Sequence, residues 1–260
     1  MTQILTPILA NEYQLLFNTC IINPNHNAAI EQAINIMVAN KDTYDAIANE
    51  AIVPWYFVAI IHCLEASQNF HKHLHNGDPL SARTVHVPAG RPITGNPPFS
   101  FHESAVDALR LDHLAPLSDS SIPGLLFAFE KFNGFGNRAH GINSPYLWSF
   151  SNHYTKGKFI RDHVFDPEAV SDQIGAAVLL RRIIEKQLLL GSTDTVTMIR
   201  QLGEQVPFDP QHFNEQALQL QKLLNSIGVN LRLDGFAGDR TSEAYQHISG
   251  KFLKGDVRRN

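Results

Sequence analysis

The chain has 260 residues, enough for one large domain or for a medium domain with a small partner. Its hydrophobic content of 43% and charged content of 18% are those of an ordinary globular protein. The net charge of −4 excludes a general attraction to nucleic acid or to another acidic polymer. No stretch approaches the length of a membrane span, and no basic segment precedes an apolar one at the N-terminus. We therefore expect neither membrane insertion nor a secretory signal peptide.

Helical periodicity dominates the first fifty residues. Residues 11–49 are predicted to form two amphipathic helices, separated by Asn23-Pro24-Asn25. The stripe of the second helix consists of Ala28, Ile30, Ala33, Ile34, Met37 and Val38. We expect these helices to pack around the next element and to carry no chemistry of their own.

The segment Val53–Leu64 is apolar on every side, which predicts a helix buried inside the protein, with Pro54 in its first turn. Glu65 stands at the end of this helix, flanked by apolar residues and close to the negative end of the helix dipole. Both surroundings raise the pKa of a carboxyl group, as a general acid near neutral pH requires. Glu65 is therefore the candidate general acid. The structural alternative is a carboxylate that satisfies buried backbone groups.

A β-hairpin is predicted to follow this helix. In the segment His71–Asp78, Asn76-Gly77 is a strong signal for a two-residue turn. Asp78 comes just beyond the turn, where we expect it to stay solvated and ionised, with His75 hydrogen-bonding beside it. A protonated carboxyl on a buried helix and an ionised one on a hairpin are the working groups of a glycosidase, about 6.5–9.5 Å apart in an inverting hydrolase.

The residues Glu65-Ala66-Ser67-Gln68-Asn69-Phe70, at a helix end and before a hairpin, resemble the lysozyme superfamily, particularly goose-type lysozymes and soluble lytic transglycosylases. The strings His73–Leu80 and Arg83–Pro92 are similar to a bacterial and phage group of this superfamily that carries a peptidoglycan-binding domain after the catalytic one. The resemblance implies a mainly α, α+β lysozyme-like fold. It also implies cleavage of the bond between N-acetylmuramic acid and N-acetylglucosamine, with Glu65 as the acid. Ala66 stands where transglycosylases usually have Ser.

The chain then becomes irregular before it turns helical again. Residues 88–98 are rich in Pro and Gly and are predicted to form a loop. A short helix is predicted for Ser104–Leu111, with Ser100 and Glu103 as its capping box. The charged residues of this helix are most simply a solvated face.

Pro123 is predicted to start a buried helix that ends near Phe132. Phe132-Asn133-Gly134 is similar to the Tyr-Asn-Ala-Gly segment that lines the sugar cleft of lytic transglycosylases, with Phe where Tyr is usual. By this resemblance, Asn133 and Gly134 are candidate substrate-binding residues.

The loop that follows is dense in aromatic and amide side chains. Aromatic faces stack on sugar rings and amides bind sugar hydroxyl groups, so Tyr146, Trp148 and Tyr154 are candidate substrate-binding residues together with His75. The alternative is a loop that its aromatic side chains hold to the core.

A helix from Asp166, its predicted N-cap, to about Leu190 is expected to close a catalytic domain of residues 1–190. Residues 191–212 are read as a linker, within which Thr195–Leu202 could form one or two further helical turns. In residues 213–260, a Leu-Gln helix stopped by Gly228 precedes an Asp-Gly-x-x-Gly-x-x-Thr turn. This unit resembles the small helical peptidoglycan-binding module. The candidate wall-binding residues are Asp234, Arg240 and Thr241, of which Thr241 can also cap the next helix.

The thirteen histidines raise the question of a metal site. The candidates alternate as neighbours on one strand face would, with one further ligand from elsewhere: His71, His73 and His75, with His62 or His86. Lys72 lies among them and no His-Glu-x-x-His pattern is present, so we expect no metal and no other cofactor. Cys20 and Cys63 have no metal-like spacing, and an inert core thiol is favoured over a disulfide.

Three functions follow from these patterns. A muramidase is favoured, because Asp78 stands where a water-activating base is needed and Phe132 departs from the transglycosylase pattern. The alternatives are a lytic transglycosylase, which needs no second carboxylate, and a wall-binding protein without activity. The expected partner is the glycan strand of peptidoglycan, with room for a delivery or inhibitor protein. Without a signal peptide, the wall would be reached by phage lysis or by a specialised secretion machine.

Overall fold

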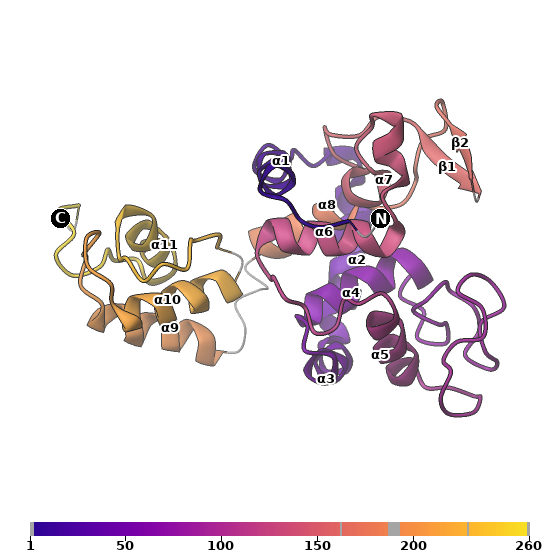
Figure 1. Ribbon diagram of the computed structural model, residues 1–260, viewed down its shortest axis with the longest axis horizontal. Coiled ribbons are helices and arrows are strands. Elements are labelled where there is room, and N and C mark those ends of the chain that lie inside the picture. Colours follow the sequence, from indigo (N-terminus) through magenta and orange to yellow (C-terminus); the bar gives the residue numbers. More distant parts are fainter. Residues whose placement is uncertain (1–2, 162, 187–192, 228, 259–260) are drawn as a thin grey trace. The chain divides into compact units, whose positions relative to one another are not determined.

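The computed structural model describes residues 3–161, 163–186, 193–227 and 229–258. It is mainly helical, with a small antiparallel sheet of two strands, which confirms the mainly α class predicted from the sequence. The α-helices are α1 (Pro7–Asn18), α2 (Asn27–Ala39), α3 (Lys41–Ala51), α4 (Trp55–Ala66), α5 (Phe101–Leu111), α6 (Ile122–Asn133), α7 (Pro145–Trp148), α8 (Ala176–Glu185), α9 (Thr193–Gln205), α10 (Glu215–Ser226) and α11 (Asp239–Ser249). Two 3₁₀ helices, η1 (Pro24–His26) and η2 (Gly136–His140), and the strands β1 (Lys158–Arg161) and β2 (Val164–Asp166) complete the elements (Figure 1).

The chain divides into two compact units. The N-terminal unit consists of Met1–Asp119 and Pro123–Arg182, and the C-terminal unit consists of Ser120–Ile122 and Ile183–Asn260. Among the described residues no single helix is both long and apolar enough to cross a membrane, although α3 and α4, bent by 110°, pass such a test as a pair.

Helix α4 is the central element of the N-terminal unit. It contacts α2 and α3 (Figure 1). The ring of Phe57 packs against that of Phe129 on α6 at a centroid distance of 4.7 Å. Ten of its twelve residues are buried, which the apolar sequence on every side of the helix predicted. The helix ends at Ser67, whose φ of 51° lies in the left-handed region.

The predicted hairpin around Asn76-Gly77 is wrong as a pair of strands. The turn forms, since the amide of Gly77 donates to the carbonyl of His73 at 3.0 Å, but only an isolated bridge between Lys72 and Pro79 accompanies it. Two hydrogen bonds flank this bridge, from the amide of His73 to the carbonyl of Asp78 and from the amide of Leu80 to the carbonyl of His71. The amide of Asp78 donates to Asn76 Oδ1 at 3.0 Å, inside the turn, instead of to the facing strand. The two-stranded sheet is formed instead by β1 and β2, which the sequence analysis did not predict.

The long helix predicted from Asp166 is also wrong at its start. Asp166 ends β2, and its Oδ1 accepts from the amides of Glu168 and Ala169 in an Asx turn, after which α8 begins ten residues later at Ala176. An Asp-Pro pair suits such a turn as well as an N-cap. The end of the predicted helix, residues 187–190, lies outside the described residues.

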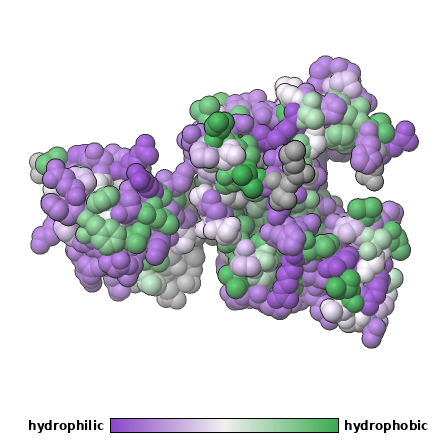
Figure 2. All heavy atoms as spheres, viewed as in Figure 1, coloured by the Kyte–Doolittle hydropathy of each residue, from purple (hydrophilic) through white to green (hydrophobic). Residues whose placement is uncertain are grey.

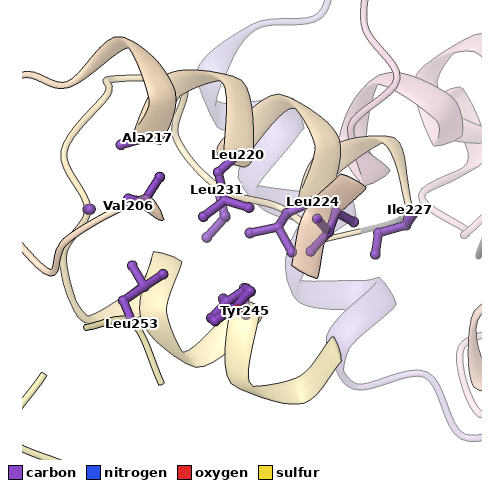
Figure 3. Packing of buried hydrophobic residues seen from close by; sticks show 11 residues of the cluster. Val206, Ala217, Leu220, Leu224, Ile227, Leu231, Tyr245 and Leu253 are labelled. Atoms are coloured by element: carbon purple, nitrogen blue, oxygen red, sulfur yellow. The ribbon is translucent and has the colours of Figure 1, made fainter. Parts of the chain in front are cut away.

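The C-terminal unit has a core of its own. Figure 3 shows side chains from α10, α11 and the intervening segments converging on one cluster, which includes Leu220, Leu224, Leu231 and Tyr245. Ile199 of α9 belongs to the same cluster, so α9 occupies much of the stretch read as a linker and packs as part of this unit. The predicted stop at Gly228 lies outside the described residues.

Candidate active site

Glu65 is held at the C-terminal end of α4 with its side chain largely surrounded by protein. Tyr146 Oη donates to Glu65 Oε1 at 2.9 Å. Burial raises the pKa of Glu65 to about 7, the hydrogen bond from Tyr146 opposes that rise, and the charge of Asp112 adds to it. A carboxyl group with this pKa is protonated in a large fraction of molecules at neutral pH.

The backbone around Glu65 is fixed from several sides. Gln68 donates from its amide to the carbonyl of His62 at 3.1 Å and from Nε2 to the carbonyl of Ala33 at 2.9 Å. The side chain of Gln173 donates to the carbonyl of Leu64. Gly77, at a φ of 76°, lies so close that a Cβ there would come within 2.8 Å of the carbonyl oxygen of Glu65. The turn at Asn76-Gly77 therefore braces the end of the catalytic candidate's helix.

A cleft of about 490 Å³ lies beside this helix end. Three of the predicted substrate-binding residues, Asn133, Gly134 and Tyr146, line it. The described lining residues do not include Glu65, but Tyr146 both lines the cleft and hydrogen-bonds to Glu65, which places the carboxyl one side chain away. In Figure 2 the surface of the N-terminal unit is hollowed on the side of β1 and β2.

The opposite wall of the cleft is the β1–β2 hairpin, which the sequence analysis missed. All four residues of β1 and the turn residue His163 line the cleft. The ring of Phe165 stacks on His140 of η2 at 3.7 Å, and Phe159 packs at 5.5 Å from the same ring. Apolar residues paired across a turn in residues 158–166 were the available signal, but strands of four and three residues are short for recognition by pattern.

Asp78 is engaged within its own loop. Its Oδ2 accepts from the amides of Val85 and His86 at 2.8 and 3.0 Å, and its Oδ1 lies 2.6 Å from His86 Nδ1. Burial alone would raise the pKa of Asp78, but these hydrogen bonds lower it to about 2. The group is ionised, as predicted, but it is buried rather than solvated and its oxygens hold the loop together.

His75 does not pair with Asp78. Its side chain has no exposed surface, and Nε2 lies 2.8 Å from Asp107 Oδ2. Asp107 also receives two hydrogen bonds from Arg91, at 2.9 and 2.7 Å. Burial lowers the pKa of His75, against the effect of Asp107. A sugar in the cleft has no access to this imidazole, so His75 supports the loop instead.

The two remaining aromatic candidates differ in exposure. Trp148 is 1% exposed and packs edge-on against His153, so it belongs to the core, which is the alternative that the sequence analysis left open. Tyr154 is half-buried, and its hydroxyl accepts from the amide of Ser171, a cleft residue, at 3.1 Å. Tyr154 thus supports the cleft wall without lining it.

The histidines considered for a metal do not converge. His62 pairs with Tyr44, His73 with Ser104 and the carbonyl of Ala82, and His86 with Asp78. Within the described ranges no group of three or more His, Cys, Asp or Glu side chains is placed to hold a metal ion. In the described part of the chain, neither Cys20 nor Cys63 forms a disulfide.

The three candidate residues of the C-terminal unit line a second pocket, of about 280 Å³. Asp234 and Thr241 both bind the buried amide of Gln221, whose Nε2 donates to Asp234 Oδ1 at 3.0 Å and to Thr241 Oγ1 at 3.2 Å. Thr241 lies inside α11 rather than capping it, since Gly238 holds the N-cap position. Arg240 is exposed at the pocket and, in the described chain, makes no ion pair. Gln221, which organises this turn, was missed because Leu-Gln repeats are ordinary in helices.

No family model, no curated protein and no solved structure matches this chain.

Proposed function

We propose that the protein cleaves the bond between N-acetylmuramic acid and N-acetylglucosamine in peptidoglycan, with Glu65 as the general acid on a lysozyme-like scaffold. One observation carries the proposal: a carboxyl group with a pKa of about 7 ends a buried helix next to a cleft of about 490 Å³. That volume lies in the range of small-molecule sites. The sequence resemblance around Glu65 adds the substrate class.

The chemistry asked of Glu65 is proton transfer to the glycosidic oxygen as the bond breaks. Burial keeps the proton on the acid in a large fraction of molecules at neutral pH, and Tyr146 donates to Oε1, so Oε2 is the oxygen that would carry the proton. When the carboxylate forms, the hydroxyl of Tyr146 stabilises its charge. A general acid of this kind contributes roughly 10²–10⁴-fold to the rate.

The muramidase reading also needs a second carboxylate to activate water. The carboxylate of Asp78 makes three hydrogen bonds in its own loop, one with Val85 and two with His86. The acid that acts electrostatically on Glu65 is Asp112. The engagement of Asp78 favours the second candidate, a lytic transglycosylase, in which the sugar's own hydroxyl attacks and Glu65 works alone. Both candidates cleave the same bond.

The C-terminal unit is proposed to hold the enzyme on the wall. Its pocket presents Asp234, Arg240 and Thr241 on a turn that Gln221 fixes from inside. A glycan or peptide end that binds there would concentrate the catalytic unit on insoluble wall.

The test is digestion of purified sacculi by the unmodified protein, by Glu65→Gln and by Glu168→Gln. Glu168 is an exposed carboxylate of the same unit, paired with Lys156, and serves as the control for charge removal. Glu65→Gln should keep the fold and lose roughly 10²–10⁴-fold in rate, while Glu168→Gln should keep its rate.

Mass spectrometry of the released fragments separates the reactions. Hydrolysis yields reducing ends and transglycosylation yields 1,6-anhydro ends. A Glu65→Gln variant that keeps more than a tenth of the rate would remove Glu65 from the mechanism. A correctly folded unmodified protein that binds sacculi but releases no fragments would point to the third reading, a wall-binding protein without activity.

A further inference from the structure

The hairpin wall of the cleft carries a charge opposite to that of the chain. The chain as a whole has a net charge of −4, yet Lys158, Arg161 and His163 line the cleft, against one described acid, Asp172. Two permanent cations on one wall form a local positive field in a cleft, where the low-dielectric surroundings strengthen it.

The register of the hairpin places Lys158 and Arg161 on the same face of the two strands. Lys158 pairs with Asp166, Phe159 with Phe165, and Arg161 with Val164, and the register shifts between Phe159 and Arg161. Because residues 166 and 164 lie on the same face of β2, the bulge turns Arg161 to the face of Lys158 instead of the face of Phe159. The aromatic face packs on η2 through His140, whereas Lys158 and Arg161 share the opposite face, and both of them line the cleft.

Neither cation is neutralised by a partner in the described parts of the chain. Over the described parts of the chain, the side chains of Lys158 and Arg161 form no hydrogen bond and no ion pair. Lys156, two residues before β1, does pair, with both oxygens of Glu168 at 2.7 Å. Asp166 lies across from Lys158, but its Oδ1 accepts from the amides of Glu168 and Ala169.

We propose that Lys158 and Arg161 bind carboxylates of the peptide that is attached to muramic acid, so that the cleft selects peptide-bearing glycan over uncharged glycan. The inference rests on the proposed function, because it names the substrate class of the same cleft. An Arg guanidinium and a Lys ammonium are the side chains that bind carboxylates best, and an uncharged oligosaccharide offers them no anion. A peptide-bearing strand supplies its anions beside the glycan chain that the cleft holds.

The experiment measures binding in the full chain carrying Glu65→Gln, so that cleavage does not interfere. The two ligands are a peptide-bearing disaccharide of muramic acid with free carboxylates and the same molecule with its carboxylates amidated. The double variant Lys158→Gln with Arg161→Gln is compared with the control Lys156→Gln with Arg110→Gln. The control removes one Lys and one Arg whose partners are Glu168 and Glu50, outside the cleft.

The Glu65→Gln chain should bind the free carboxylates about tenfold more tightly than the amidated ligand, as expected for two partly exposed ion pairs. The cleft variant should lose this preference and bind both ligands alike, while the control pair keeps it. Equal affinity for the two ligands before substitution, or equal losses in both double variants, would overturn the inference. Cleavage of sacculi by the unmodified protein is scored separately, so a charge-selective cleft without cleavage would leave this inference standing and reject the proposed function.

Discussion

The carboxyl group of Glu65 holds its proton at a pH at which an exposed glutamate is ionised. Its pKa of about 7 lies above the ordinary value of 4.5, chiefly because of burial. The folded protein therefore binds more protons than the unfolded chain between these two values, and stability falls as the pH rises through this window. Below pH 4.5 the group costs nothing, and above pH 7 the cost is complete.

The first prediction follows from this loss of stability with rising pH. Glu65→Gln has no charge to bury, so its free energy of unfolding relative to the unmodified protein should increase from pH 4.5 to pH 7.5 by about 1–3 kcal/mol. Urea unfolding of both proteins at a series of pH values measures the difference. A difference that stays constant across this range would mean that Glu65 titrates normally.

The hydroxyl of Tyr146 is the one described partner that favours the ionised form of Glu65 by a hydrogen bond. Tyr146→Phe should therefore raise the pKa of Glu65 further and move the alkaline limb of the activity profile to higher pH, with a lower maximal rate. Tyr154→Phe is the matched control, because its hydroxyl bonds to Ser171 and Ala169 and not to Glu65. Rates on soluble glycan between pH 5 and pH 9 give both limbs. Identical profiles for the two Phe variants would contradict the role of Tyr146.

Asp78 is predicted to act on stability rather than on chemistry. Its pKa of about 2, below the ordinary 3.8, means that its contribution is present above pH 3.8 and is lost as the pH falls through 2. Asp78→Asn should lower the free energy of unfolding by roughly 1–3 kcal/mol, since the amides of Val85 and His86 lose a charged acceptor. At a temperature where the variant is folded, its turnover should stay within about tenfold of the original. A loss of roughly 10² or more in the fully folded variant would restore Asp78 as the catalytic base.

At the scale of elements, the turn at residues 76–77 packs directly against the backbone at the end of α4. Gly77 and Gly90 have nearly equal φ values, 76° and 78°, so an alanine at either position meets the same backbone strain. A Cβ at Gly77 would press on the carbonyl of Glu65, whereas a Cβ at Gly90 would have nothing within 4 Å. Comparing alanine at Gly77 and at Gly90 therefore separates the effect of backbone strain from the effect of the contact with Glu65.

We predict that Gly77→Ala lowers both stability and turnover more than Gly90→Ala does. The shared strain should cost about 1 kcal/mol in each variant, and the added contact in Gly77→Ala displaces the helix end that carries Glu65. Thermal unfolding and turnover on soluble glycan measure the two effects. Equal turnover in both folded variants would show that the turn does not position Glu65.

Elements with a strong local signal were predictable from the sequence. The apolar run of α4 placed Glu65 at a buried helix end, and Ser100 and Glu103 form both hydrogen bonds of the predicted capping box. What was missed depends on pairings that no local pattern fixes. The partner of His75 is Asp107, 32 residues away, and the loop after Asp78 folds back so that Val85 and His86 occupy its carboxylate. An Asp-Pro pair suits both an N-cap and a turn, so the sequence alone could not show that Asp166 forms a turn instead of starting a helix.

At the scale of the whole molecule, each unit has its own core and its own pocket. The core of the C-terminal unit includes Ile199 of α9. Removing the chain after Leu202 would therefore cut through α9 and expose what remains of that core. A point substitution in the full chain is the cleaner way to ask what the unit does. Arg240 is suited to it, because it is exposed at the pocket of Asp234 and Thr241 and carries no structural ion pair in the described chain.

The last prediction is that Arg240→Gln weakens attachment to the wall without changing catalysis. The test uses a chain that also carries Glu65→Gln, so that the sacculi stay intact. In it, Arg240→Gln should lower the affinity for sacculi several-fold, as the loss of one charge-assisted contact implies. Lys251→Gln, an exposed cation of the same unit outside the pocket, should bind as before. With Glu65 restored, all forms should cleave soluble glycan at equal rates, because the substrate then needs no anchoring. Equal sedimentation of the Arg240 and Lys251 variants would remove the pocket from wall binding, and a parallel loss on soluble glycan would instead tie the C-terminal unit to the reaction itself.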